Sequence, residues 1–122
     1  MPSDTDIVHV VDDDEAMRDS MAFLLRAENF QVQTYADAAD FLAALPQIKV
    51  GCVVTDVRMP GMSGIELQER LKHEGYTMPV IFITAFPRER ERALAMGGGA
   101  VCFLTKPFDV KTLVKCIEEA LM

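Results

Sequence analysis

The sequence predicts an α/β protein with a doubly wound parallel sheet of five strands. Short apolar runs rich in β-branched residues alternate five times with longer amphipathic segments along the 122 residues. Each connection between successive apolar runs is long enough for one helix, which is what a pair of parallel strands requires. A chain of this length is usually one domain, so we expect residues 1–122 to form a single domain.

The expected strands differ in their patterns. Residues 30–34 alternate apolar and polar side chains, which is typical of a half-exposed edge strand. The other four are nearly continuous apolar runs, as expected of strands covered on both faces, and comprise residues 7–11, 52–55, 79–84 and 100–104. An edge position for the second strand favours the strand order 2-1-3-4-5, which is the flavodoxin-like arrangement.

The helices are predicted from apolar spacing and from their capping residues. Asp37, Ser63 and Asp109 each precede a helical pattern in the position of an N-cap. Glu66 stands three residues after Ser63 and completes a capping box, while Pro46 is expected to end the second helix. The side chains expected to face the core are Met17, Met21, Leu24, Leu25, Phe41, Leu42, Leu45, Ile65, Leu67, Leu71, Val110, Leu113, Val114, Ile117 and Leu121.

Composition excludes several classes of function. The formal charge of −7 argues against direct binding of nucleic acid, which requires a basic face. No apolar run approaches the length of a membrane span and the polar start is no signal peptide, so we expect a cytoplasmic protein. Cys52, Cys102 and Cys116 lie in apolar segments without the spacing of a zinc site, and we expect reduced, buried thiols.

Polar side chains follow four of the predicted strands where each strand ends. Parallel strands bring their carboxyl ends to one edge of the sheet, and the winding reverses between strands one and three, where ligands bind in such folds. The residues at this edge are Asp12 and Asp13 after strand one, Asp56 after strand three, Thr84 after strand four and Lys106 after strand five.

These five side chains together indicate phosphoryl chemistry. Three converging carboxylates repel one another unless a hard cation lies among them, and a small all-oxygen site suits Mg²⁺. A lysine and a hydroxyl nearby can hold the oxygens of a phosphoryl group transferred to Asp56. Each residue alone has an ordinary structural explanation; Asp14 and Glu15, for example, suit a helix N-terminus. The convergence of all five at one edge favours the functional interpretation.

At this point the chain resembles the receiver domains of two-component response regulators, which have a CheY-like fold, over essentially its whole length. The matching segments are VVDDDEAMR after strand one, VVTDVRMPGMSG around Asp56, IFITA in strand four and FLTKPF in strand five. Their order and separation match as well. Within the family the chain is most similar to the FixJ-type receivers, through Arg58-Met59-Pro60 and Lys106-Pro107-Phe108.

The resemblance implies a role for each residue of the metal site. Asp56 would accept the phosphoryl group from a phosphohistidine of a sensor histidine kinase, or from a small phosphodonor. Asp13 and Asp56 would ligate Mg²⁺, or Mn²⁺ as an alternative, and Asp12 would act through water. The backbone carbonyl of Arg58 would complete the protein ligands. Such a chain is no enzyme in the usual sense, because it catalyses only its own phosphorylation and dephosphorylation.

The resemblance also implies a switch. Lys106 would pair with the phosphoryl group, and its peptide bond to Pro107 is typically cis in the family. Thr84 would bond a phosphoryl oxygen on activation, and Phe103 would turn inward as Thr84 moves. Phosphorylation would then change the surface formed by the fourth helix, the fifth strand and the fifth helix, and we expect a homodimer there that controls a transcriptional output.

Three other classes of protein share part of this pattern. A haloacid-dehalogenase-like phosphatase shares the same chemistry, but it needs its nucleophile at strand one and Thr or Val where Ala16 stands, and the chain has no room for a substrate cap. A flavodoxin-like cofactor domain needs a first loop rich in Gly, Ser and Thr, whereas this loop is acidic. A degenerate receiver acting only as an interaction module would not need the complete set of five residues.

Departures from the family pattern follow the fourth strand. Residues 85–88 read Ala-Phe-Pro-Arg, where FixJ-type receivers tend to carry a glycine-rich polar loop. We expect Pro87 to stiffen this loop and Gly97–Gly99 to weaken the end of the fourth helix, predicted over 87–96. The charged run 88–92 is either a solvated face or a dimer contact. We expect these departures to affect how the surface responds to phosphorylation and to leave the phosphorylation chemistry unchanged.

Overall fold

The computed structural model describes residues 6–45 and 50–122 and contains a five-stranded sheet in the order β2-β1-β3-β4-β5. Every neighbouring pair in this sheet is parallel. The strands are β1 (Ile7–Val11), β2 (Gln31–Tyr35), β3 (Gly51–Asp56), β4 (Val80–Thr84) and β5 (Cys102–Thr105). The predicted fold class and strand order are therefore confirmed.

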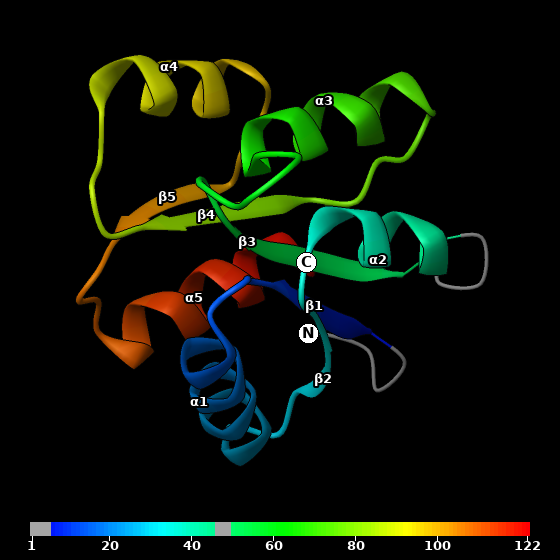
Figure 1. Ribbon diagram of the computed structural model, residues 1–122. Helices are drawn as coiled ribbons and strands as arrows, with labels where there is room; N and C mark the ends of the chain where they lie inside the picture. Colours follow the sequence, from blue (N-terminus) through cyan, green and yellow to red (C-terminus); the bar gives the residue numbers. More distant parts are fainter. Residues whose placement is uncertain (1–5, 46–49) are drawn as a thin grey trace.

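Helices cover both faces of the sheet. They are α1 (Glu15–Ala27), α2 (Ala38–Ala44), α3 (Gly64–His73), α4 (Glu89–Gly97) and α5 (Val110–Ala120). Figure 1 shows α1 and α5 on one face and α2, α3 and α4 on the other. This three-layer arrangement buries the central strands on both sides, which explains why they read as continuous apolar runs.

The core has one part on each face of the sheet. Alternate residues of a strand point to opposite faces, so Val8 and Val10 of β1 pack on the side of α1 and α5, together with Leu25 and Ile117. The other part lies under α2, α3 and α4, and its fully buried side chains include Phe41, Val53, Leu67, Phe82 and Ala95. Burial of each large side chain contributes roughly 1.5–3 kcal/mol.

The predicted helix caps are confirmed. The side chain of Asp37 accepts a hydrogen bond from the backbone of Asp40, and Asp109 accepts one from Lys111. Ser63 and Glu66 form the reciprocal capping box, with bonds of 3.1 and 3.2 Å between side chain and backbone.

Several details differ from the predictions. Leu24 is 39% exposed, so its assignment to the core was wrong; Ala22 is buried instead, because α1 is rotated so that the face with Met21, Ala22 and Leu25 meets the sheet. The helix α4 begins two residues later than predicted, since Arg88 has an extended backbone. The strands β2 and β5 are also shifted, to 31–35 and 102–105. Pro46 lies outside the described residues.

The expectation of three reduced thiols is wrong for two of them. Cys102 on β5 and Cys116 on α5 form a disulfide, with Cα atoms 6.3 Å apart, whereas Cys52 is a buried free thiol. The pairing arises because Cys102 points from the sheet toward α5 and Cys116 points from α5 toward the sheet, where both join the same apolar layer. The sequence separation of 14 residues carries no local signal of this contact.

Candidate functional site

The strand register places Asp12 and Asp56 side by side. Val11 of β1 pairs with Thr55 of β3, and each of these residues is followed directly by an aspartate. Asp56 in turn pairs with Ile83 of β4, the residue before Thr84. The predicted site residues are thus brought to the carboxyl edge of the sheet by the backbone pairing alone.

The three carboxylates form a compact cluster. Oxygen atoms of Asp12, Asp13 and Asp56 all lie within 4.8 Å of one another. Asp12 is 2% exposed, Asp56 is half-buried and Asp13 is exposed, so the cluster opens to solvent through Asp13. The electrostatic repulsion among the three carboxylates is strongest at Asp12, because water is excluded there.

Lys106 reaches into this cluster from the end of β5. Its Nζ lies 3.1 Å from Oδ2 of Asp56 and donates a hydrogen bond there, and it lies 3.7 Å from Oδ2 of Asp12. The backbone N–H of Lys106 also donates to the carbonyl of Thr84, at 2.8 Å. The peptide bond between Lys106 and Pro107 is cis, as the resemblance implies.

The pKa of Asp12 is raised above its ordinary value, chiefly because burial removes water from the carboxylate. The backbone N–H of Asp14, which donates to Asp12 Oδ1 at 2.9 Å, and the Lys106 ammonium both lower this pKa. The neighbouring charges of Asp56 and Asp13 raise it further. A bound cation would relieve both the burial cost and this repulsion.

The donor set fits a small hard cation. Carboxylate oxygens are the ligands that Mg²⁺ prefers, and it uses one or two of them while keeping several waters. The exposed Asp13 leaves a path by which water and a phosphodonor can enter. The backbone N–H of Arg58 donates to Oδ1 of Asp56 at 3.2 Å, which holds that carboxylate in place. The role of the Arg58 carbonyl as a ligand stays a prediction.

Thr84 and Phe103 occupy positions that a switch would use. Thr84 is 2% exposed at the end of β4, and its Oγ1 accepts a hydrogen bond of 3.3 Å from the N–H of Phe86. Phe103 on β5 is half-buried on the face covered by α2, α3 and α4, with its ring centroid 6.2 Å from that of Phe82. The proposed movement of these two side chains stays a prediction.

The Arg58 side chain makes contacts that the sequence did not predict. Its Nη2 lies 2.8 Å from Oε1 of Glu91 on α4 and donates a bond of 2.9 Å to the carbonyl of Phe86. A second, longer contact of 3.4 Å joins Nε to Oε2 of Glu91. Glu91 is therefore paired with Arg58 and does not face solvent alone. Arg58 also connects the loop after Asp56 to the loop after Thr84. The 33-residue separation gives no local signal of this link.

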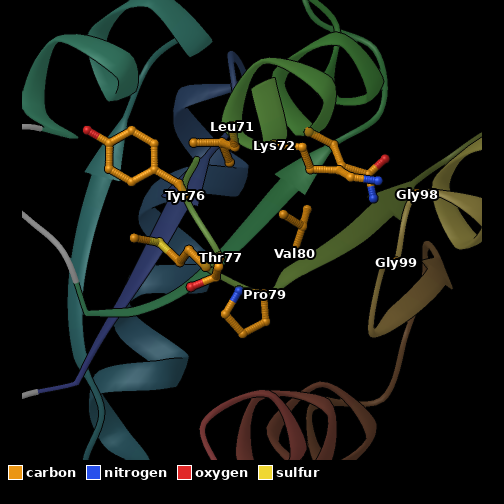
Figure 2. A pocket seen from close by; sticks show the side chains of 10 residues that line it. Leu71, Lys72, Tyr76, Thr77, Pro79, Val80, Gly98 and Gly99 are labelled. Carbon is orange, nitrogen blue, oxygen red and sulfur yellow. The ribbon is translucent and has the colours of Figure 1, made fainter. Parts of the chain in front are cut away.

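A pocket of about 340 Å³ lies away from this site (Figure 2). Its walls come from the end of α3, the first residues of β4 and the turn after α4, represented by Leu71, Tyr76, Val80 and Gly99. The pocket is thus at the amino edge of β4, whereas the acidic cluster is at the carboxyl edge of the sheet. It makes no contribution to the candidate site.

The geometry favours Asp56 over Asp12 as the phosphoacceptor. Lys106 is closer to Asp56, and Asp56 is half-buried while Asp12 is almost fully enclosed. A haloacid-dehalogenase-like phosphatase would need the reverse, with its nucleophile on β1.

Among the described residues, no helix has both the length and the apolar character needed to cross a membrane.

Comparisons with known proteins identify relatives of a single family. Residues 8–118 match the family described as the response regulator receiver domain. The transcriptional regulatory protein FixJ of Bradyrhizobium diazoefficiens is 46% identical over 93% of this chain, and FixJ of Rhizobium meliloti is 42% identical over 93%. These matches cover 56% and 55% of the relatives, so the chain spans about half their length.

Solved structures show the same architecture. The crystal structure of FixJ-N has a TM-score of 0.89 at 41% identity and covers 94% of this chain and 92% of that one. The chemotaxis protein CheY4 of Vibrio cholerae has a TM-score of 0.84 at 27% identity, with coverage of 95% and 98%. With the family match extending over nearly all of its residues, the chain belongs to the response regulator receiver domains.

Proposed function

We propose that this chain accepts a phosphoryl group on Asp56 in a Mg²⁺-dependent reaction and thereby switches a regulatory surface. The observation that carries the proposal is the contact of 3.1 Å between Lys106 Nζ and Asp56 Oδ2, beside the carboxylates of Asp12 and Asp13. Phosphoryl transfer requires a nucleophile, a cation-binding group and a fixed positive charge, and the proximity of these side chains supports the proposal.

Each residue has a defined part in the transfer. A carboxylate oxygen of Asp56 attacks phosphorus and forms the new P–O bond, while the bond from phosphorus to the donor breaks and the donor leaves with its electron pair. Lys106 neutralises charge on the phosphoryl oxygens, and the Arg58 N–H orients Asp56. Asp13, Asp56 and the Arg58 carbonyl would hold Mg²⁺, or Mn²⁺ in its place, and Asp12 would act through water. The bound cation supplies charge stabilisation of the transferred group.

The switch begins at Thr84. Its hydroxyl is engaged by the Phe86 N–H in the structure described, and moving toward a phosphoryl oxygen would release that bond. The space vacated would admit Phe103, which lies on the same face of the sheet. Rearrangement of α4, β5 and α5 would then favour a homodimer through this surface. The loop 85–88 and the glycines after α4 would determine how readily the surface formed by α4, β5 and α5 rearranges.

A sensor histidine kinase is the protein partner that we propose as phosphodonor. Family membership supports a kinase as phosphodonor, and relatives named transcriptional regulators support a regulatory output in the cytoplasm of a bacterium. The net charge of −7 makes direct nucleic-acid binding by this chain unfavourable. A single receiver domain over residues 1–122 is part of the same proposal.

Intact-mass spectrometry tests the proposal directly. Incubation with Mg²⁺ and acetyl phosphate should add one phosphoryl group, and the gain should disappear when the metal is chelated. Asp56→Asn should abolish the gain because it removes the nucleophilic carboxylate. Glu118→Gln, an exposed change on α5, is the matched control and should react like the wild type. An unmodified wild-type chain, with both acetyl phosphate and a phosphorylated histidine kinase, would refute phosphoacceptor function.

A further inference from the structure

Two of the three cysteines join the strand that precedes Lys106 to the helix that follows it. Cys102 is the first residue of β5 and Cys116 lies in the second half of α5, and their sulfur atoms are in disulfide contact. The β5 strand leads directly to Lys106, and Cys102 precedes Phe103. The bond therefore ties together two elements of the surface proposed to respond to phosphorylation. Figure 1 shows α5 lying against the face of the sheet that ends in β5.

The packing of α5 does not depend on this bond. Leu113 and Ile117 of α5 are 2% and 0% exposed and pack in the same apolar layer as Ile81 and Ile83 of β4. Burial of these side chains holds the helix on the sheet whether the two sulfur atoms are joined or not. The bond can therefore open and close in a folded chain.

The two sulfur atoms differ in access to solvent. Cys116 is 5% exposed, whereas Cys102 is half-buried on the last strand of the sheet. A small thiol or disulfide reagent can therefore reach Cys102 first, and Cys116 lies within reach to complete the exchange.

Cys52 provides an internal contrast. It is 0% exposed on the central strand β3, and burial, with a smaller contribution from the charge of Asp6, raises the pKa of its thiol to about 12. A thiol of this kind stays protonated and inert near neutral pH. Thiol–disulfide exchange in the folded chain is thus confined to Cys102 and Cys116.

We propose that Cys102 and Cys116 are a reversible redox pair that fastens α5 to β5 when oxidised. The Cys102 thiolate attacks a small disulfide such as glutathione disulfide, forms a mixed disulfide and releases one glutathione thiolate. The Cys116 thiolate then attacks Cys102 sulfur and displaces the second glutathione. Two protein thiols are oxidised to one disulfide, and one small disulfide is reduced to two thiols. Excess reduced glutathione reverses both steps.

The oxidised form should resist the rearrangement of the switch surface. A covalent bond between β5 and α5 removes the relative movements that phosphorylation would otherwise drive. The redox state of the two cysteines would therefore control this rearrangement in addition to phosphorylation. This consequence rests on the proposed function, whereas formation of the bond and its effect on α5 do not.

Thiol counting tests whether the bond forms. The chain is equilibrated with reduced or oxidised glutathione, quenched in acid, denatured and alkylated with N-ethylmaleimide. Because the chain has three cysteines, the reduced sample should carry three adducts and the oxidised sample one. Tryptic cleavage after Lys111 and Lys115 separates Cys102 from Cys116, so a linked peptide pair should appear only in the oxidised sample. Three adducts after oxidation, or glutathione retained on Cys102, would overturn the proposal.

Hydrogen exchange tests whether the bond restrains α5. Amides of α5 should exchange several-fold more slowly in the oxidised chain than in the reduced chain, and Cys102→Ser should abolish this difference. The matched control Cys52→Ala should keep it. Equal exchange in both redox forms of the wild type would show that the bond restrains nothing.

Dimerisation driven by beryllofluoride and Mg²⁺ gives the functional readout. Sedimentation should show several-fold less dimer in the oxidised wild type than in the reduced one, with no redox effect in Cys102→Ser. Equal dimerisation of the two wild-type forms would refute the redox input. Absence of dimer in both forms would instead count against the proposed phosphorylation-driven dimer, and the thiol count and α5 exchange would still decide the redox pair.

Discussion

His9 is a fully buried imidazole on the interior strand β1. Its Nδ1 lies 3.0 Å from the hydroxyl of Tyr35, and the ring packs against Tyr35 and Phe41, with ring centroids 5.8 and 5.5 Å away. Burial lowers the pKa of His9 below its ordinary 6.5, and a backbone contact with Val50 opposes the shift only in part. The fold therefore holds this histidine neutral.

A neutral, buried His9 predicts a loss of stability in mild acid. Below pH 6.5 the unfolded chain binds a proton at His9 that the folded chain excludes, so the free energy of unfolding falls as the pH drops toward the folded pKa. The loss approaches about 1.4 kcal/mol per pH unit in that window and is absent above it. Urea unfolding of wild type and His9→Gln at about pH 8 and about pH 5.5 measures the difference.

The contribution of His9 is isolated by comparing variants, because other groups also titrate in acid. His9→Gln should lose less stability than the wild type between the two pH values, since glutamine can bond Tyr35 without titrating. His73→Gln, which changes an exposed histidine on α3, should behave like the wild type. Equal losses in wild type and His9→Gln would contradict the argument.

At the scale of elements, Arg58 connects two loops and a helix. It lies two residues after Asp56, and its guanidinium contacts both Glu91 on α4 and the Phe86 carbonyl in the loop that starts at Thr84. The Arg58 and Glu91 side chains are 36% and 23% exposed, so solvent screens the pair only partly. The link holds α4 and its preceding loop close to Asp56.

Removing this link should loosen the loop before α4. Arg58→Met keeps the apolar stem but deletes the guanidinium, so amides of residues 86–91 should exchange faster by hydrogen-exchange mass spectrometry. A double-mutant cycle with Glu91→Gln should give a coupling of about 0.2–1 kcal/mol. Unchanged exchange in this segment would show that the contact does not restrain it. The exposed pair Arg70–Glu74, at the C-terminal end of α3, provides a matched cycle that leaves the loop unaffected.

At the scale of the whole molecule, a metal ion bound at the acidic cluster would couple binding to folding stability. Asp12, Asp13 and Asp56 converge only when β1 and β3 are paired, so the unfolded chain lacks the site. A cation that binds the folded chain alone stabilises it by mass action, by about 2.7 kcal/mol at one hundred times the dissociation constant. The same cation relieves the repulsion among carboxylates that the fold imposes.

Mg²⁺ should therefore raise the melting temperature of the wild-type chain in a saturable manner. Asp13→Asn should weaken the effect strongly, because it deletes an exposed ligand without disturbing the core. Glu118→Gln should leave the Mg²⁺ dependence intact. Thermal unfolding across a Mg²⁺ titration at constant ionic strength measures both. An equal rise in wild type and Asp13→Asn would contradict the assignment of Asp13 as a ligand.

Local patterns in the chain were sufficient to predict the sheet and the residues at its edge. The strand order followed from one half-exposed run at 30–34 among four apolar ones, and parallel pairing then placed Asp12, Asp56, Thr84 and Lys106 together. These inferences succeed because strand periodicity, caps and the carboxyl ends of strands are properties of neighbouring residues and of backbone geometry.

Contacts between distant side chains depended on the packed structure. Helix rotation and side-chain direction decide three features of the structure. They are the face of α1 that meets the sheet, the bond between Cys102 and Cys116, and the ion pair between Arg58 and Glu91. Those are set when the helices settle onto the sheet and fill the core, and no pattern of neighbouring residues encodes them. The location of the acidic cluster and Lys106 is thus evident from sequence order, whereas the links between the surrounding elements arise from tertiary packing.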